Sequence, residues 1–331
     1  MPFWRIAQIH HRGFLVGDWL TMGITESNYK KYLSSKQYYS LHPYNGRYSD
    51  WIDDKLTLKY ILHGTELSEH MPDYYFLIRG DGVIHALMDC PFIKDTYSAE
   101  DIFDLLAAKR ELAIKKIKGS LGIGFYKAEY LYDGTILLNN KPVDRNTFIQ
   151  ILKETEGGYV VTEYLHPHKD LAKFSENTAN TIRYIACRVD GQLQYFKGYV
   201  RFGTKQSGAV ENFNAGGVLC SLDQNGIFKE GYILSDIKKM SIKIIKTMPD
   251  TNIPLCGKIP HWDEIEFVVK KTDHLFPMLD YLGFDFVVTA DEKVNILEIN
   301  SLTSFEGLQI DGPVYDNAVG NSFFSGLLSR K

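Results

Sequence analysis

The stretch that most constrains the fold is residues 283–300, where two apolar runs lie on either side of a short polar turn. The runs cover residues 286–289 and 294–299. Apolar runs separated in this way predict a β-hairpin. Because side chains alternate across a strand, Glu298 and Asn300 are expected to project from the same face.

Three polar residues of this hairpin are candidate metal ligands. Asp285 begins the first strand, and pairing across the hairpin is expected to bring it near Glu298. With the amide oxygen of Asn300, the two carboxylates form a set of hard oxygen ligands that suits Mg²⁺. Without a cation, adjacent carboxylates repel and raise each other's pKa. An edge hairpin with solvated polar ends also explains the triplet, but polar side chains inside an apolar run need partners, which favours the metal site.

Composition excludes some classes of function. The chain has 331 residues, enough for one large domain or two to three small ones, and its 44% hydrophobic and 24% charged content is typical of a globular protein. A formal net charge of -4 shows no basic footprint, so no nucleic-acid partner is expected. No apolar run approaches the roughly 20 residues of a spanning helix, so no transmembrane segment is expected.

The four cysteines, Cys90, Cys187, Cys220 and Cys256, lie far apart with no CxxC pair. This pattern argues against a cysteine zinc site and against a disulfide framework. The first residues lack the apolar core of a signal peptide. A reduced, cytoplasmic location is therefore expected, and the sequence leaves the oligomeric state open.

Helical and strand patterns are interspersed, and most strands fall in hairpins, which favours an α+β fold over a doubly wound sheet. Helices are expected at 53–62, 98–109, 144–154, 235–248 and 262–279, the last one broken near Pro277. Strands are expected at 74–78, 83–88, 112–115, 159–162, 181–189 and 193–201, the last two joined by the turn Asp190-Gly191. Residues 203–217 contain four glycines and are expected to form a loop too polar to bury.

Residues 113–125 are expected to form a strand that enters a glycine-rich loop. Glycines let backbone N–H groups approach phosphate oxygens closely, and a lysine on the preceding strand can reach the same phosphates. The segment matches neither GxxxxGK[ST] nor GxGxxG. Taken alone, a glycine turn between two strands is the commoner explanation of this pattern.

Residues 160–165 are an apolar strand that becomes a short connector. Such a connector can offer a backbone C=O and N–H to the edge of an adenine ring. The alternative is an ordinary strand end, stopped by Pro167. Both interpretations remain open on these residues alone.

Taken together and in this order, the motifs resemble the ATP-grasp superfamily, and most closely its sugar-transfer-associated branch, over residues 53–309. The interval of 13 residues from Asp285 to Glu298 resembles that of D-alanine–D-alanine ligases in the same superfamily. In chain order the resemblance is carried by Asp54-Lys55-Leu56, Lys115, residues 119–124, Glu163-Tyr164-Leu165, Asn180-Thr181-Ile182-Arg183, Arg201, residues 212–217, Asp285 and Glu298-x-Asn300.

The resemblance implies an ATP-grasp fold, with ATP bound between two α+β lobes. The implied division is an N-terminal segment at 1–52, an N-lobe at 53–158 and a C-lobe at 159–331. For the nucleotide, the resemblance implies phosphate contacts for Lys55 and Lys115, a phosphate-covering loop with Gly119, Ser120, Gly122 and Gly124, an adenine hinge at Glu163, Tyr164 and Leu165, and a ribose contact at Asp170. For the metal, it implies the Mg²⁺ ligands Asp285, Glu298 and Asn300. For the reaction, it implies that Arg183 and Arg201 stabilise the transferred phosphoryl group.

Two of these roles have alternatives in the sequence. Lys116 stands where many members of the family have proline, and alternation allows only one of Lys115 and Lys116 to face the nucleotide. We choose the phase in which Ala113 and Lys115 share the inward face. Without the resemblance, Arg183 and Arg201 would be interpreted as exposed arginines on a sheet face.

The function that the resemblance implies is an ATP-dependent ligase that joins a small-molecule carboxylate to an amine through an acyl phosphate, with ATP and Mg²⁺. The association with sugar transfer suggests a carboxylated sugar or an amino acid in surface-polysaccharide biosynthesis. One alternative is a kinase that phosphorylates a small molecule or sugar. Another is a non-catalytic ATP-binding protein.

Overall fold

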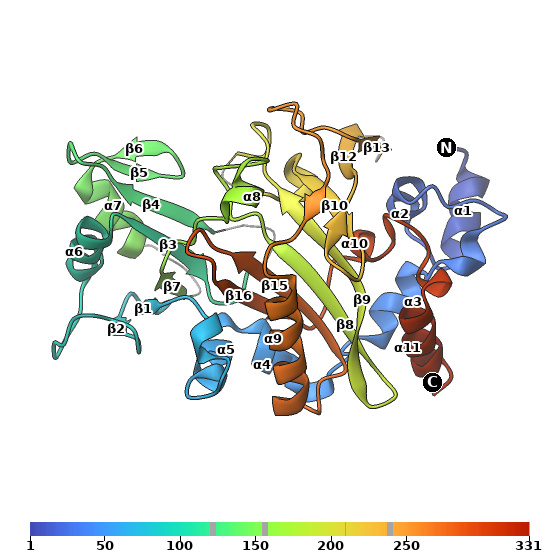
Figure 1. Ribbon diagram of the computed structural model, residues 1–331, viewed down its shortest axis with the longest axis horizontal. Coiled ribbons are helices and arrows are strands. Elements are labelled where there is room, and N and C mark those ends of the chain that lie inside the picture. The colour runs from blue at the N-terminus through green and yellow to red at the C-terminus, as the bar shows by residue number, and fades with distance from the viewer. Residues whose placement is uncertain (120–123, 154–157, 209, 237–240, 331) are drawn as a thin grey trace. The chain divides into compact units, whose positions relative to one another are not determined.

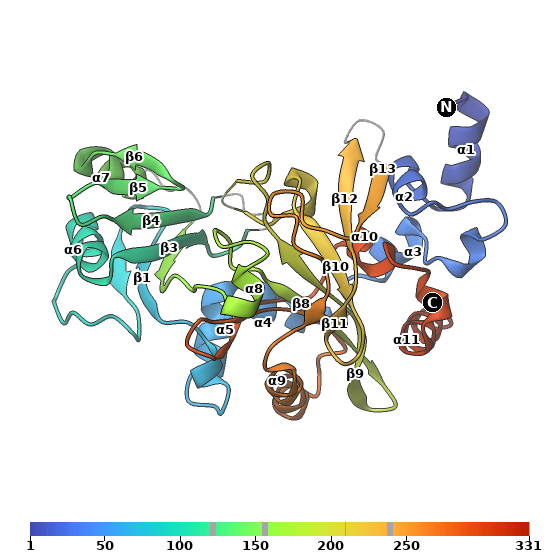
Figure 2. The same cartoon turned by 45° about the horizontal axis from the view of Figure 1, so that its top comes forward.

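The computed structural model describes residues 1–119, 124–153, 158–208, 210–236 and 241–330 (Figures 1 and 2). The chain divides into two compact units, one made of Met1–Asp53 with Pro167–Lys331 and the other of Asp54–His166. Residues 1–53 therefore fold with the C-terminal part of the chain. The Asp54–His166 unit ends at His166, whereas the sequence placed the end of the N-lobe at residue 158. The strand at Tyr159–Thr162 pairs within the sheet of this unit.

The Asp54–His166 unit contains a seven-stranded antiparallel sheet in the order β2-β1-β7-β3-β4-β5-β6. Its described elements are α5 (Lys55–Leu62), η3 (Ser68–His70), β1 (Tyr74–Ile78), β2 (Ile84–Ala86), α6 (Ala99–Lys109), β3 (Glu111–Lys116), β4 (Tyr126–Tyr130), β5 (Ile136–Leu138), β6 (Lys141–Val143), α7 (Arg145–Lys153) and β7 (Tyr159–Thr162). Helices α6 and α7 pack on one face of this sheet and enclose the unit's hydrophobic core.

Side-chain caps explain where two helices of this unit begin. The carboxylate of Asp54 accepts a hydrogen bond from the N–H of Thr57 at 2.8 Å, and Asp144 accepts one from the N–H of Thr147 at 2.8 Å. Each cap satisfies a backbone donor that the first helical turn leaves unpaired. The predicted helix starts at 53–55 and 144 are thereby confirmed.

The other unit is built on a seven-stranded antiparallel sheet in the order β13-β12-β10-β9-β8-β15-β16. The described strands of this unit are β8 (Ile182–Val189), β9 (Gln192–Phe202), β10 (Val218–Leu222), β11 (Ile227–Phe228), β12 (Gly231–Asp236), β13 (Ser241–Ile245), β14 (Gly257–Lys258), β15 (Tyr281–Val288) and β16 (Val294–Asn300). The helices are α1 (Phe3–His11), α2 (Val16–Thr21), η1 (Tyr29–Lys31), α3 (Ser35–Leu41), η2 (Gly46–Tyr48), α4 (Ser49–Asp53), α8 (Lys169–Ala172), η4 (Phe213–Ala215), α9 (Trp262–Leu275), α10 (Phe305–Gln309), η5 (Val314–Asp316) and α11 (Ala318–Leu328).

Helices cover both faces of this sheet. On one face, Trp262 of α9 packs on Tyr184, with ring centroids 5.6 Å apart. On the other face, Phe324 of α11 contacts Phe196 of β9 and Tyr38 of α3. Figure 1 shows α3 and α11 side by side. The first 53 residues thus contribute directly to the core, a role that the sequence did not predict. Together with the other unit, this arrangement confirms the predicted α+β class.

The predicted helix at 235–248 is wrong. Strand β12 occupies residues up to Asp236, and β13 (Ser241–Ile245) pairs with it in antiparallel register. Ile237 and Met240, which supported the helical spacing, lie outside the described residues. The remaining run is rich in isoleucine, whose branched Cβ favours strands, and short apolar runs cannot separate helix from strand by periodicity alone.

The described residues of the loop at 203–217, which exclude residue 209, are less exposed than expected. Thr204 and Ser207 are buried, because their polar groups satisfy one another: the N–H of Thr204 donates to the Ser207 hydroxyl at 2.8 Å. The Thr204 hydroxyl also donates to the carbonyl of Gly216 at 2.9 Å. Local side-chain to backbone bonds thus allow a polar loop segment to be buried.

The predicted turn at Asp190-Gly191 and the predicted helix break near Pro277 are confirmed. Asp190 and Gly191 adopt φ of 52° and 81° in the turn between β8 and β9, as a tight hairpin requires. Helix α9 ends at Leu275, before Pro277. The four cysteines are free thiols. None of the helices in the described part of the chain combines the length and the apolarity needed to cross a membrane.

Asp18 of α2 is a buried carboxylate in this unit, and it accepts a hydrogen bond from the hydroxyl of Ser35. Burial raises the pKa of Asp18 from its usual 3.8 to about 6, with the neighbouring Glu306 acting in the same direction. A raised pKa in the folded state means that folding favours the protonated acid. Ionisation of Asp18 therefore lowers stability as the pH rises from about 4 to about 6.

An Asp18→Asn variant tests this assignment. Asparagine keeps an acceptor for Ser35 and removes the buried charge. At about pH 7.5 the variant is expected to exceed the parental protein by about 1–2 kcal/mol in the free energy of unfolding, with little difference at about pH 3.5. Urea denaturation at both pH values measures this. A difference of the same size at both would exclude Asp18 as its source.

Candidate functional site

Polar side chains form a row across four neighbouring strands of the Met1–Asp53/Pro167–Lys331 unit. Tyr199 pairs with Arg183, Arg183 with Asp285, and Asp285 with Glu298. Directly opposed residues on antiparallel strands share a face of the sheet. Since Tyr184, the next residue along β8, packs on α9, the row projects from the face opposite that helix. The register confirms the predicted pairing of Asp285 with Glu298.

Asp285 is bound by two arginines. Arg183 forms a bidentate pair with it, with Nε–Oδ1 at 2.6 Å and Nη2–Oδ2 at 2.8 Å, and Nη2 of Arg201 lies 3.0 Å from Oδ2. The side chains of Arg183 and Asp285 are only 7% and 5% exposed. Burial raises the pKa of Asp285, but the two guanidinium groups outweigh it and hold this pKa below its usual value. Arg183 is therefore not an exposed arginine on the sheet face.

Arg201 is held on its other side by Thr181 and Glu211, which the sequence did not assign to the site. Nε of Arg201 donates to the hydroxyl oxygen of Thr181 at 2.9 Å, and that hydroxyl donates to Oε1 of Glu211. Glu211 also accepts from the N–H of Thr181 at 3.1 Å. Burial raises the pKa of Glu211. Because Glu211 lies in an irregular loop, no periodicity in the sequence marks its direction.

Asn300 and Glu298 are next to each other, as alternation predicts. In this structure the amide NH₂ of Asn300 donates to Oε1 of Glu298 at 3.2 Å and to the carbonyl of Gly283 at 3.3 Å. Turning the amide over would instead present its oxygen beside the carboxylate. The following residue, Ser301, donates its N–H and its hydroxyl to Asp53 at 2.7 and 2.6 Å, which fixes the end of β16.

The donor set of this hairpin fits Mg²⁺ in its chemistry, since Asp285, Glu298 and Asn300 supply oxygen atoms only. Arg183 and Arg201 place two positive charges beside this hairpin. A bare cation would therefore be opposed by Arg183 and Arg201, whereas a cation that arrives with phosphate oxygens brings anions for both. This donor chemistry is compatible with a cation that binds together with phosphate groups.

The Asp54–His166 unit carries the predicted phosphate-binding residues. Lys55 is buried at the start of α5, and its Nζ donates to the carbonyl of Gly119 at 3.3 Å. Gly124 has a φ of 76°, and an added Cβ would lie 2.9 Å from the side chain of Lys116, so the chain needs glycine there. Ser120 and Gly122 lie outside the described residues.

Lys115 and Lys116 project from opposite faces of β3. Ile114 is part of the unit's core, so Lys116 shares the core face, where its Nζ lies 5.9 Å from the centre of the Tyr159 ring. Lys115 projects from the opposite face with Ala113. The structure thus agrees with the chosen strand phase, and the phosphate contact of Lys115 remains a prediction.

Lys115→Ala is expected to weaken ATP binding more than the matched variant Lys116→Ala. Losing one charge-assisted phosphate contact should cost about 1.5–3 kcal/mol of binding free energy. Isothermal titration with a non-hydrolysable ATP analogue measures both affinities. A larger loss for Lys116→Ala would transfer the role to that residue.

The predicted hinge follows β7. Glu163 is exposed and its N–H donates to the carbonyl of Asp73 at 2.9 Å, whereas Leu165 is buried. Tyr164 lies under Nζ of Lys127, which is 4.6 Å from the ring centre. The backbone at this point is thus anchored to its own sheet, as a rigid adenine contact would require.

Lys127 belongs to a charged cluster beside the hinge that the sequence did not reveal. Its Nζ lies 2.9 Å from Glu111, whose other carboxylate oxygen is hydrogen-bonded to His166. The His166 hydrogen bond and Lys127 lower the pKa of Glu111 to about 2. Lys127 pairs with Ala113 across β3 and β4, so it projects from the same face as Lys115. The alternation of side chains along these strands is the signal in the sequence that could have indicated this face.

Asp170, the predicted ribose contact, lies at the start of α8 in the other unit. Its carboxylate is exposed, and its N–H donates to Nδ1 of His168 at 3.1 Å. An exposed carboxylate can accept from ribose hydroxyls, so its chemistry is compatible with the predicted role.

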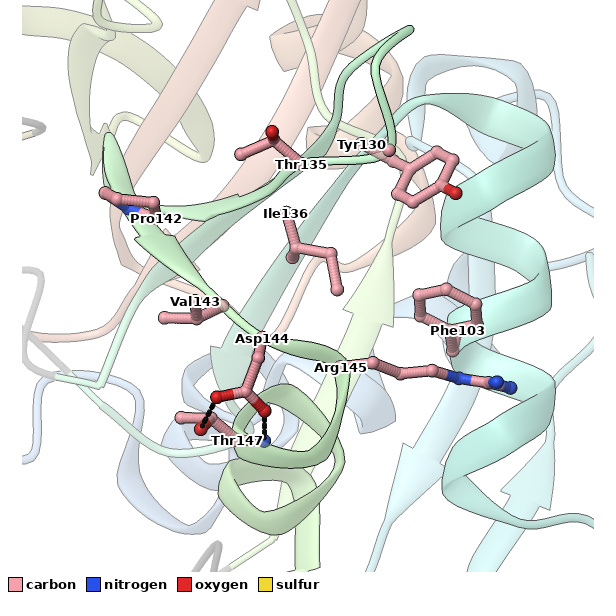
Figure 3. A pocket seen from close by; sticks show the side chains of 10 residues that line it. Phe103, Tyr130, Thr135, Ile136, Pro142, Val143, Asp144, Arg145 and Thr147 are labelled. Atoms are coloured by element: carbon pink, nitrogen blue, oxygen red, sulfur yellow. Dashed lines mark hydrogen bonds between the residues drawn. The ribbon is translucent and has the colours of Figure 1, made fainter.

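A surface pocket that none of these residues lines lies between α6, α7 and the β4–β6 strands of the Asp54–His166 unit (Figure 3). Its charged groups already have partners. Asp144 caps α7 through Thr147, and Arg145 pairs with Glu100 at 2.5 Å while lying 4.4 Å from the centre of the Phe103 ring. The pocket therefore presents little unsatisfied chemistry and is not the candidate site.

The model of the family described as sugar-transfer associated ATP-grasp matches residues 34–319. A search of the curated proteins found no match. Similar solved structures include the ATP-grasp ligase PsnB complexed with a minimal precursor (12% identity, 87% of this chain and 64% of that chain, TM-score 0.44). D-alanyl-alanine synthetase A from Vibrio cholerae O1 is also similar (10% identity, 87% and 62%, TM-score 0.43). This chain spans less than two thirds of either protein.

Proposed function

Because the chain belongs to the sugar-transfer-associated ATP-grasp family, we propose that it is an ATP-dependent ligase that joins a carboxylate to an amine. The family match also confirms the predicted ATP-grasp fold. The observation that carries the proposal is the buried cluster in which Asp285 binds Arg183 and Arg201 beside Glu298. It combines oxygen ligands for a cation with guanidinium groups for anions.

Arg183 and Arg201 each keep one guanidinium nitrogen that can donate hydrogen bonds to a substrate. Arg183 engages Asp285 through Nε and Nη2, and Arg201 uses Nε and Nη2 on Thr181 and Asp285. Among the described residues, Nη1 of each arginine has no hydrogen-bond partner. A guanidinium group can bridge two oxygen atoms at once. We assign these two nitrogens to the reacting carboxylate and the transferred phosphoryl group.

The reaction that follows has two steps. A carboxylate oxygen attacks the γ-phosphorus, the bond to the β,γ-bridging oxygen breaks, and ADP leaves. The amine then attacks the acyl carbon, phosphate leaves with the electron pair of the C–O bond, and the nitrogen loses a proton to solvent. The chain's part is positioning and charge stabilisation, which account for most of the catalysis in phosphoryl transfer.

The remaining predicted residues take the nucleotide in this proposal. Lys55 and Lys115 contact phosphates, the loop that begins at Gly119 covers them, residues 163–165 receive the adenine and Asp170 receives the ribose. Asp285, Glu298 and Asn300 would hold Mg²⁺, which when bound neutralises charge on the phosphates.

We further propose that the substrates are a carboxylated sugar or an amino acid with its amine partner, used in surface-polysaccharide biosynthesis. The support is the family's association with sugar transfer. Residues 203–217 and 301–314 are the segments we assign to the acceptor pocket. The first contains Glu211 and the second follows Asn300 directly, so both adjoin the cluster.

ADP release in a screen of amino acids and uronic acids, alone and in pairs, tests the proposed function. An acid that supports ADP release only, or much faster, with an amine present is the expected result. ADP release that depends on a hydroxyl compound and ignores amines would contradict it and identify a kinase.

A further inference from the structure

Three residues outside the proposed ATP machinery bring their side chains to one point. His168 precedes α8, His261 precedes α9 and Glu292 lies in the turn between β15 and β16. One ligand-type atom from each lies within 4.8 Å of those from the other two. We call these three residues the two-histidine cluster.

The geometry of the cluster is convergent. Nε2 of His168 lies 3.0 Å from Oε2 of Glu292, and Nε2 of His261 lies 2.9 Å from the same oxygen. The ring centres of the histidines are 6.1 Å apart at a steep angle. Two imidazole nitrogens and one carboxylate oxygen therefore face a common point.

The backbone holds this arrangement in place. His168 is buried, and its N–H donates to the carbonyl of Val288 at 2.8 Å. His261 and Glu292 have φ of 52° and 66°, in the left-handed region that residues with a Cβ rarely adopt. Residues kept in such conformations are fixed by their surroundings and often belong to functional sites.

Each histidine also has a carboxylate behind its ring. Oε2 of Glu264 lies 3.6 Å from Nδ1 of His261, and Oδ2 of Asp170 lies 3.8 Å from Nδ1 of His168. A carboxylate that receives the second ring proton is the usual support of a metal-binding histidine. In this structure the N–H of Asp170 donates to Nδ1 of His168, which places the ring proton on Nε2. A cation at Nε2 would shift that proton to Nδ1, where it would face the Asp170 carboxylate and displace the hydrogen bond from the Asp170 N–H.

We propose that His168, His261 and Glu292 bind one divalent transition-metal ion of the Zn²⁺ class. Two imidazole nitrogens and one carboxylate oxygen form a borderline donor set that suits zinc and leaves a fourth position for water. Mg²⁺ prefers oxygen donors alone, so the two-histidine cluster is chemically distinct from the Asp285 hairpin.

The electrostatic surroundings agree with this proposal. Oε2 of Glu292 faces both histidines. Nζ of Lys169 lies 3.8 Å from Oε1 of Glu292, on the oxygen that the histidines do not use. A bound ion would tie the segment before Asp170 to α9 and to the β15–β16 hairpin.

Titration of the full chain with Zn²⁺ alone, after treatment with a chelator and in excess Mg²⁺, tests the site. His261→Asn and Glu292→Gln are each expected to lower the zinc affinity at least about tenfold. Asparagine is chosen because it tolerates the left-handed backbone at position 261. His274→Asn, at an exposed position on α9, serves as the matched control and should bind as the parental chain does.

Zinc should also raise the melting temperature of the parental and His274→Asn proteins but not of the two cluster variants. Melting curves without zinc show whether each variant folds. Unchanged zinc affinity in His261→Asn and Glu292→Gln would overturn the proposal. Loss of zinc binding in Glu298→Gln alone would also overturn it, since the ion would then be bound by Asp285, Glu298 and Asn300 of the β15–β16 hairpin.

Discussion

Glu298→Gln is expected to reduce the ATP-dependent reaction by at least about 10²–10³-fold while the fold is retained. Glutamine has the same shape and can still accept the hydrogen bond from Asn300. It lacks the negative charge that would hold a cation against the phosphates, and the loss falls on the charged transition state. ADP release under saturating ATP measures the effect.

Asp291→Asn is the matched control for this variant. Asp291 lies in the turn of the same hairpin, where it pairs with Lys293 at 2.7 Å on the surface. Its loss should leave turnover within about twofold of the parental value, because a surface pair contributes little. If Glu298→Gln turned over at the parental rate, the metal-ligand assignment would be wrong.

Arg183→Met is expected to lower the free energy of unfolding by about 3–5 kcal/mol. The substitution leaves the buried carboxylate of Asp285 with Arg201 as its arginine partner, and an incompletely paired buried charge is costly. Denaturant unfolding of the purified protein measures the change. The double variant Arg183→Met/Asp285→Asn should recover much of the loss, since it removes both charges.

Lys31→Met provides the comparison on the surface of the same unit. Lys31 and Asp316 form an exposed pair at 3.3 Å, and breaking it should cost less than about 1 kcal/mol. Equal losses for Arg183→Met and Lys31→Met would mean that Asp285 does not depend on Arg183. The central ion pair of the site would then be energetically unimportant.

Local patterns predicted the parts of the site that lie on regular strands. The alternation of Glu298 and Asn300 and the pairing with Asp285 follow from one hairpin, in which register is set by the nearby turn. The phase of Lys115 follows from the same rule on β3. These features need only neighbours along the chain or across one turn, so sequence alone is sufficient for them.

Features that depend on distant packing could not be predicted. Glu211 reaches Arg201 through Thr181, 30 residues earlier in the chain, from an irregular loop. Asp53 holds Ser301 across 248 residues. The helix at 235–248 was wrong because isoleucines at helical spacing also fit an edge strand, and sheet pairing decided between the two.

The contribution of residues 1–53 was hidden for the same reason. Tyr38 donates to the carbonyl of Thr303 at 2.8 Å, and the side chain of Asn45 binds the backbone of Tyr281 on both its C=O and N–H. These contacts stabilise β15 and the loop that follows β16, on either side of the β15–β16 hairpin. Nothing in the spacing of the N-terminal tyrosines indicates which strand they cover.

Trapping with hydroxylamine tests most directly the claim that this protein activates a carboxylate. The full chain is incubated with ATP, Mg²⁺, hydroxylamine and each acid that supports ADP release. Hydroxylamine attacks acyl phosphates, so the account predicts that a hydroxamate accumulates in step with ADP and that Glu298→Gln forms neither. A phosphate ester that resists hydroxylamine, formed as the sole product, would contradict the account.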